Sequence, residues 1–296
     1  MFWFVYAILF AFFDAGTLTV NQRYRVDGYM LAAWRGFGVS LCALPFLFFV
    51  TLPIEWSFWL RAAMQGIFTG FLTSRLYNSV ALFGAGATSR ILVLSIVISA
   101  LMWWGLHPED FTALARNPAL LIGIIASLAA AIYGYLRMSD HARSQGIVGY
   151  MALAVIVAAV ISVNRKSLMS LDGFLAGNTI YFLVSMFVSG VYNSLAYFIK
   201  TKCSIREFFA VATEIRSVKS GGIIALLSAL SLFFCDYALS EAPNPAYVNA
   251  ITLSSPLWVL VYNRFTGYKN NFRKSGLAIM LISTAILIAL SEAAQN

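Results

Sequence analysis

Charged side chains are scarce in this sequence. Asp, Glu, Lys and Arg make up 11% of its 296 residues, whereas hydrophobic residues make up 60%. About a quarter of the residues in a soluble domain are charged, so a water-soluble fold could not cover this much apolar surface. The three cysteines, Cys42, Cys203 and Cys235, are far apart and form no C-x-x-C motif. This spacing excludes a cysteine metal motif and a disulfide framework.

The apolar residues are gathered in long uninterrupted runs. A helix needs about 20 such residues to cross the hydrocarbon core of a bilayer, and it satisfies its own backbone hydrogen bonds there. A membrane β-barrel would show short alternating strands instead. We therefore predict an all-α integral membrane protein with ten transmembrane helices and no separate soluble domain. The predicted ranges are 2–20, 29–53, 62–83, 87–106, 118–137, 146–163, 174–199, 221–240, 245–263 and 274–291.

Short sequence matches indicate that the chain contains the same unit twice. Val20-Asn21-Gln22-Arg23 closes the first apolar run, and Val163-Asn164-Arg165-Lys166 closes the sixth. Ala81-Leu82 and Ala238-Leu239 end the third and eighth runs in the same way. An odd number of spans in each copy requires the two copies to be inverted, as in many secondary transporters. We expect one transmembrane domain built from two inverted five-helix repeats, residues 1–143 and 144–296.

The basic residues are divided unevenly between the two sets of predicted loops. Loops after the odd-numbered spans hold thirteen of the twenty Lys and Arg residues, and loops after the even-numbered spans hold four. Short cytoplasmic loops accumulate Lys and Arg, so both termini are predicted to be non-cytoplasmic, in a plasma or inner membrane. Residues 204–219 mix apolar and charged side chains. They form either an amphipathic surface helix or an ordinary charged linker.

Five charged side chains fall inside predicted spans. Such a residue costs about 2.5–3.5 kcal/mol on insertion scales unless it faces a cavity or a partner. Asp14 and Arg35 lie at similar depth and form either a structural ion pair or part of a substrate site. Arg75 and Arg90 either bind an anionic group or extend to the membrane surface. Asp236 either takes part in proton coupling or, as we favour, lies exposed to water at the mouth of a vestibule.

Uncharged polar side chains in the spans extend this candidate site. Amides and hydroxyls there hold a substrate or bond neighbouring helices, and Gly66-x-x-x-Gly70 predicts close helix packing. Ser254-Ser255-Pro256 is expected to interrupt the ninth span and to free backbone carbonyls. The predicted substrate-binding residues are Arg35, Arg75, Tyr77, Asn78, Arg90, Tyr192, Asn193, Asn249, Ser254 and Ser255, with Asp14 and Asp236 as coupling or ion-pair residues.

Several of these features occur together in one known family. They are Ala-Ala-Trp-Arg35-Gly in the second span, the two Ala-Leu span ends, Ala242-Pro-Asn-Pro-Ala-Tyr-Val-Asn-Ala-Ile251 before Ser254-Ser255-Pro256, and Lys274-Ser-Gly276. Over nearly the whole chain the pattern resembles the drug/metabolite transporter superfamily in its ten-helix EamA-like form. The resemblance implies that helices 1–4 and 6–9 surround a central cavity, with helices 5 and 10 at the periphery. It also implies a small metabolite as substrate, such as an amino acid, a nucleotide sugar or a phosphorylated sugar.

The chain departs from that family pattern in two places. Thr266-Gly267-Tyr268 follows the ninth span, where EamA-like members often carry an acidic residue. Many members are drawn with both termini in the cytoplasm, whereas the basic residues of this chain predict the opposite side. These departures concern the subfamily and the orientation, and they leave the predicted helix count unchanged.

Three functions are open at this stage. The first, which we favour, is an alternating-access carrier for an anionic or zwitterionic solute, because the arginines in its spans make the cavity electropositive. The second, an enzyme acting on a lipid, is disfavoured because His107 and His141 lie in loops on opposite faces and the acidic residues do not cluster. The third is a non-transporting scaffold. We expect no enzyme activity, cofactor, metal or nucleic-acid partner. The expected partners are a lipid bilayer and a small-molecule substrate, with a homodimer left open.

Overall fold

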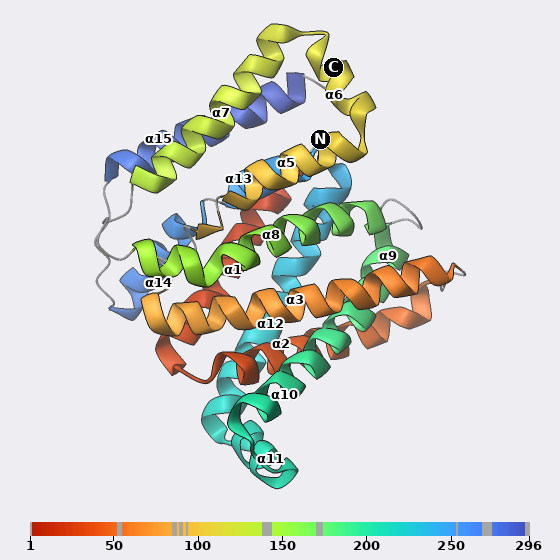
Figure 1. The fold of residues 1–296 in the computed structure, drawn as a ribbon, viewed down its shortest axis with the longest axis vertical. Coiled ribbons are helices and arrows are strands. Elements are labelled where there is room, and N and C mark those ends of the chain that lie inside the picture. The colour runs from red at the N-terminus through yellow and green to blue at the C-terminus, as the bar shows by residue number, and fades with distance from the viewer. Residues whose placement is uncertain are drawn as a thin grey trace.

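The structure is a computed structural model that describes residues 2–51, 55–84, 88, 91–92, 94–137, 144–169, 174–252, 254–267 and 274–293. Within these residues the regular elements are all helices, which lie side by side as a bundle (Figure 1). Long apolar runs dictate this, because a helix satisfies its backbone polar groups without water. The helices are α1 (Trp3–Tyr24), α2 (Gly28–Ala43), η1 (Leu44–Phe49), α3 (Trp56–Phe83), α5 (Leu94–Leu106), α6 (Pro108–Ala115), α7 (Pro118–Arg137), α8 (Ser144–Met169), α9 (Phe174–Tyr181), η3 (Phe182–Met186), α10 (Phe187–Thr201), α11 (Ile205–Thr213), α12 (Ile215–Glu241), α13 (Pro245–Thr252), α14 (Ser255–Thr266) and α15 (Lys274–Ala293).

Six helical stretches among the described residues are long and apolar enough to cross a membrane. They are Trp3–Tyr24, Gly28–Phe49, Gly146–Met169, Leu175–Thr201, Ile215–Glu241 and Ser275–Ala293. A seventh is added if α6 and α7, which bend by 112° between them, form one broken span. The predicted all-α membrane class is therefore supported. Each of the ten predicted ranges contains a helix, while ten crossings stay a prediction.

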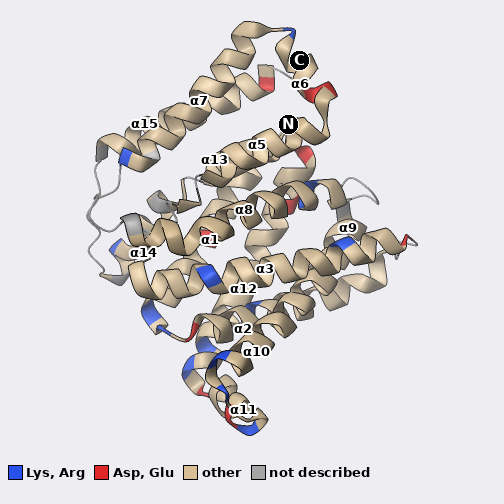
Figure 2. Ribbon diagram, in the orientation of Figure 1, with Lys and Arg blue, Asp and Glu red and all other residues tan. Residues whose placement is uncertain are grey.

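Charged side chains lie mainly at helix ends and around α11, and most of the middle of the bundle is uncharged (Figure 2). Two buried apolar clusters make up most of the core. One joins α1, α5, α6, α7, α12, α13 and α15, and the other joins α2, α3, α8, α9, η3 and α12. Lipid tails are as apolar as these side chains, so tight packing holds the helices together more than exclusion of water does.

Glycines bring the backbones of several helices into direct contact. A Cβ atom at Gly36 on α2 would lie 2.5 Å from the backbone nitrogen of Gly190 on α10. One at Gly66 on α3 would lie 2.5 Å from the carbonyl oxygen of Ser185, in the π-helical turn η3. The close packing predicted for Gly66 is thus confirmed. A larger side chain at either glycine would force the two helices apart.

The predicted interruption of the ninth span is also confirmed. Helix α13 ends at Thr252 and α14 begins at Ser255. The backbone N–H of Ser254 donates to the carbonyl of Ile251 at 2.9 Å, and the N–H of Leu257 donates to the carbonyl of Ser254 at 2.8 Å. Both hydrogen bonds join residues three apart in the chain, so the α-helical pattern of four is interrupted at Ser254.

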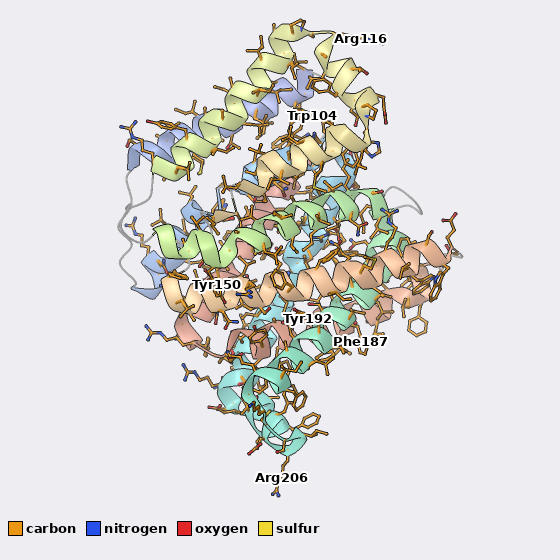
Figure 3. The ribbon with its side chains drawn as sticks, viewed as in Figure 1. Trp104, Arg116, Tyr150, Phe187, Tyr192 and Arg206 are labelled. Carbon is orange, nitrogen blue, oxygen red and sulfur yellow. The ribbon has the colours of Figure 1, made fainter. Side chains whose placement is uncertain are left out.

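Of residues 204–219, the structure places 205–213 in a separate short helix, α11, and 215–219 in the first turns of α12. The side chain of Ser204 accepts a hydrogen bond from the N–H of Glu207 at 3.3 Å, and the carboxylate of Glu207 accepts one from the N–H of Ser204 at 2.6 Å. This reciprocal cap begins α11, and it holds the pKa of Glu207 below its usual range. Ile205 and Phe209 are exposed on α11, and Arg206 projects away from the bundle (Figure 3).

Candidate functional site

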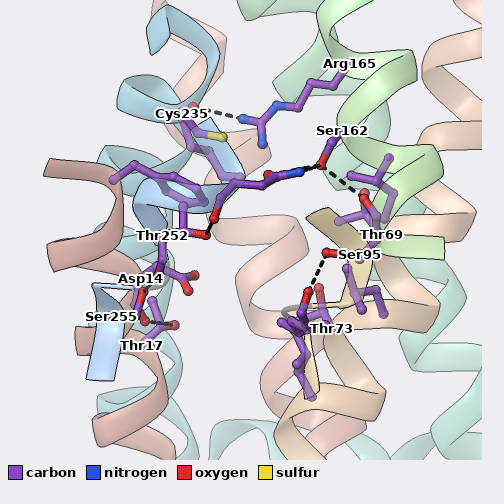
Figure 4. Close-up of a pocket in the computed structure, with 18 of the residues that line it drawn as sticks. Asp14, Thr17, Thr69, Thr73, Ser95, Ser162, Arg165, Cys235, Thr252 and Ser255 are labelled. Atoms are coloured by element: carbon purple, nitrogen blue, oxygen red, sulfur yellow. Dashed lines mark hydrogen bonds between the residues drawn. The ribbon is translucent and has the colours of Figure 1, made fainter. Parts of the chain in front are cut away.

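A cavity of about 190 Å³ lies inside the bundle. It is lined by residues of α1, α2, α3, α5, α8, α9, α12, α13 and α14, several of which point toward one another in Figure 4. Among the described residues, α7 and α15 contribute nothing to this lining and pack against each other at the edge of the bundle. Its polar lining residues are Asp14, Thr17, Arg35, Thr69, Thr73, Tyr77, Ser95, Ser162, Arg165, Tyr181, Cys235, Asn249, Thr252 and Ser255.

Arg35 extends from α2 into the cavity and is held by two hydroxyl groups. Its Nη1 donates to Oγ1 of Thr73 at 2.7 Å, and its Nε donates to Oγ of Ser228 at 3.0 Å. Both acceptors are uncharged. They orient the guanidinium without neutralising it, so the planar fork keeps donors for a further acceptor.

Asp14 of α1 lines the same cavity. Within the described part of the chain, its carboxylate forms no hydrogen bond and no ion pair, and the charge of Arg35 acts on it through space. The two residues therefore share the cavity without the direct ion pair that their similar depth suggested. In this part of the cavity the carboxylate of Asp14 and the guanidinium of Arg35 are therefore not satisfied by each other.

A second arginine of the cavity, Arg165, does have a charged partner. Its Nε forms an ion pair with Oδ1 of Asp236 on α12, and its Nη2 donates to the carbonyl of Leu232 at 2.9 Å. The guanidinium lies over the ring of Tyr181, 5.0 Å from its centroid. The side chains of Arg165 and Asp236 are 5% and 0% exposed.

This pair corrects two expectations from the sequence. The expected water-exposed position of Asp236 is wrong, because the side chain is fully buried beside a cation. Arg165 was expected in a loop after a span that ends at residue 163, whereas α8 continues to Met169 and carries Arg165 inside the bundle. Arg165 follows Ile161 by one turn of α8, and both residues line the cavity.

Asn249 connects three helices at the cavity wall. Its Nδ2 donates to Oγ of Ser99 on α5 and to Oγ of Ser162 on α8, at 3.2 Å in both cases. On the far side of the interruption in the ninth span, Oγ of Ser255 donates to the carbonyl of Thr252 at 2.6 Å. Four predicted binding residues, Arg35, Tyr77, Asn249 and Ser255, thus lie around the cavity together with the predicted coupling or ion-pair residue Asp14.

Arg75 lies outside that lining. Its guanidinium lies near the rings of Phe71 and Tyr150, 5.4 and 4.8 Å from their centroids. Such contacts stabilise a cation by about 0.5–1 kcal/mol at exposed sites and by about 2 kcal/mol or more where water is excluded. The structure therefore gives Arg75 aromatic partners between α3 and α8.

The other predicted residues are distributed as follows. Asn78, Tyr192, Asn193 and Ser254 lie outside the cavity lining, and Arg90 falls outside the described residues. Tyr192, which belongs to α10 (Figure 3), packs against Gly70 of α3. Nδ2 of Asn193 donates to the carbonyl of Ser189 one turn earlier. These contacts are of the helix-packing kind.

Thr69 and Thr73 of α3 are the main part of the site that sequence reasoning missed, whereas Tyr77 on the same helix was predicted. Thr69, Thr73 and Tyr77 follow one another at intervals of four, which places them on one face of the helix. That spacing was readable in the sequence. Among the described residues, no three His, Cys, Asp or Glu side chains come together as a group that could hold a metal ion.

No family model and no curated protein matches the chain. A solved structure described as "Crystal structure of protein" aligns with it at a TM-score of 0.62, with 14% sequence identity. The alignment covers 98% of this chain and 97% of the other. At this identity the match shows a shared fold over nearly the full length of both chains.

Proposed function

We propose that this protein is a secondary transporter that carries a small zwitterionic metabolite by alternating access. We assign it to the drug/metabolite transporter superfamily, in its EamA-like form with ten transmembrane helices. Support comes from an all-helical apolar bundle that encloses a cavity lined with polar and charged groups. Ionisable residues inside spans normally mark substrate or ion pathways.

The charge balance of the cavity carries the proposal. Arg165 is neutralised by Asp236, so these two residues leave no net charge for a solute. Arg35 has only hydroxyl partners, and Asp14 has no direct partner among the described residues. A solute with a carboxylate for Arg35 and an ammonium group for Asp14 would give each residue an oppositely charged partner. An α-amino acid is the simplest such molecule.

Matching contacts in the two halves support the inverted repeats 1–143 and 144–296. In the first half, Nδ2 of Asn21 on α1 donates to the carbonyl of Tyr77 on α3 at 2.9 Å. In the second half, Arg165 on α8 donates to the carbonyl of Leu232 on α12. In each case the end of the first helix of a half is bonded to the backbone of its third helix. Rocking of one half against the other would expose the cavity alternately to the two sides.

The orientation in this proposal follows from the loops. The face that carries most of the Lys and Arg residues is cytoplasmic, which puts both termini on the non-cytoplasmic side of a plasma or inner membrane. A homodimer is compatible with this arrangement, and transport requires only the single bundle.

Uptake into proteoliposomes tests the proposal. We expect saturable uptake of one or more neutral amino acids and little uptake of cations that lack a carboxylate. Arg35→Met and Asp14→Asn should each abolish that uptake, because each removes one of the two charges offered to the solute. Arg116→Met is the matched control, since Arg116 is exposed at the turn between α6 and α7.

Two outcomes would refute the assignment. One is transport restricted to cations, and the other is zwitterion uptake that persists unchanged in Arg35→Met. Thermal unfolding of the purified protein gives an independent measurement, because a bound solute raises the unfolding temperature by mass action. The rise should be present in Arg116→Met and absent in Arg35→Met.

A further inference from the structure

A second pocket, separate from the central cavity, opens on the outside of the bundle between α2, η1, α9, η3 and α12. Its volume is about 270 Å³, and it shares no lining residue with the central cavity among the described residues. Phe46, Leu226 and Phe233 line it and are 51%, 59% and 40% exposed. These residues lie within membrane-spanning stretches, so the medium outside the pocket is lipid hydrocarbon.

One polar group stands out in this apolar pocket. Asn178 of α9 lines it and is 3% exposed, and its Oδ1 has no hydrogen-bond partner within the part of the chain that the structure describes. An unsatisfied buried acceptor costs about 1–3 kcal/mol, and most such groups in native structures have a partner. A ligand with an N–H or O–H donor would provide one.

The depth of the pocket matches a lipid in one leaflet. Asn178 lies one turn after the start of α9, so it is near one end of the membrane-spanning stretch. The C-terminal end of α12 lies on the same side of the membrane. Leu226 lies two turns before Phe233 on α12, which places it about 10 Å deeper toward the middle of the bilayer. The donor group of a lipid would therefore meet Asn178 near the headgroup level, while its chain follows Phe233 to Leu226.

We propose that this pocket binds one lipid acyl chain whose polar end carries a hydroxyl donor, and that this hydroxyl bonds to Oδ1 of Asn178. Exposed apolar walls accept the chain, and the unpaired amide oxygen selects lipids with a donor over lipids without one. The site does not depend on transport, so failure of the proposed carrier activity would leave it in place.

Photo-crosslinking of the full chain in phosphatidylcholine nanodiscs tests this site, because phosphatidylcholine itself has no hydrogen-bond donor. The probe is a monoacylglycerol with a diazirine in its chain, and adducts are located by peptide mass spectrometry. We expect adducts on the α12 segment from Leu226 to Phe233, above the level at Leu101, an exposed apolar residue of α5 that reports general lipid contact. Unlabelled monoolein should displace the probe, and methyl oleate should not.

Two variants separate the hydrogen bond from the apolar walls. Asn178→Leu keeps the volume and removes the acceptor, so pocket adducts should fall about three- to tenfold, the range for one hydrogen bond. Leu226→Trp fills the deep end and should lower the adducts while Asn178 is intact. Equal displacement by monoolein and methyl oleate, or unchanged adducts in a folded Asn178→Leu protein, would overturn the proposal. Adducts no higher than at Leu101 would overturn it as well.

Discussion

Two arginines line the same cavity but have different interaction partners. Arg165 is buried against a carboxylate, a backbone carbonyl and an aromatic ring, whereas Arg35 is held by two hydroxyl groups. A carboxylate satisfies a guanidinium permanently, and hydroxyls only orient it. The comparison shows that residue type alone does not identify a binding residue. What identifies one is the charge left over after the protein's own partners are counted.

The largest effect is expected when Asp236 is removed. Asp236→Ala leaves Arg165 as an uncompensated buried charge, so the free energy of unfolding should fall by about 3–5 kcal/mol. Chemical or thermal unfolding of the purified protein in detergent measures this. The double variant Arg165→Met/Asp236→Leu should recover most of the loss, because it removes both charges together. A double variant as unstable as the single one would show that the ion pair is not the cause.

Removal of Arg35 should act on binding instead. Arg35→Met deletes charge-assisted hydrogen bonds of about 1.5–3 kcal/mol each, so the affinity for a zwitterionic solute should fall at least about tenfold. Equilibrium binding of the solute that performs best in the uptake screen measures this change. Arg35→Lys keeps the charge and loses the planar fork, and an intermediate affinity is expected. If Arg35→Met destabilises the protein as much as Asp236→Ala does, the proposed contrast between the two arginines is wrong.

A smaller effect is expected from the hydroxyl that orients Arg35. Thr73→Val keeps the shape of the side chain and removes the acceptor of the 2.7 Å hydrogen bond. Loss of one hydrogen bond of about 1 kcal/mol should weaken solute binding about fivefold and leave maximal uptake nearly unchanged. The Michaelis constant and maximal rate, measured in the same proteoliposomes, separate the two effects. An unaltered Michaelis constant would mean that Thr73 does not position Arg35.

The smallest effect is expected at a surface ion pair. Lys200 donates to the carboxylate of Asp27 at 2.8 Å, and the two side chains are 50% and 29% exposed. Lys200→Met should lower the free energy of unfolding by less than about 1 kcal/mol, and added salt should diminish the difference. Unfolding at low and high ionic strength gives the measurement. A loss comparable to that of Asp236→Ala would show that burial is not what makes the Arg165 pair strong.

The helices of this protein were accessible from the sequence because long apolar runs leave few alternatives in lipid. The ends of the helices were harder to predict from the sequence. Arg165 was taken to close its span because a charged residue ends a hydropathy window, yet its compensating carboxylate, Asp236, belongs to another helix. No local pattern reveals a partner that only the packing of α8 against α12 brings near.

The direction in which a side chain points from its helix could be predicted from the sequence for some residues only. Arg35 and Asp14 were identified as cavity residues, and both line it. Arg75 follows Thr73 by two positions, which turns it about 200° around α3 and away from the face that carries Thr73 and Tyr77. The charge alone therefore did not separate the cavity residues Asp14 and Arg35 from Arg75, and helical spacing was needed to tell them apart.

The contact between Gly36 and Gly190 has a consequence for motion. Backbone meets backbone there, between helices that belong to opposite halves of the chain, and the ring of Phe37 packs on Gly190 beside the contact. Because no Cβ atom separates the two backbones at this point, a rocking motion of one half over the other would turn about this contact, and a larger residue at either glycine would hold the halves apart.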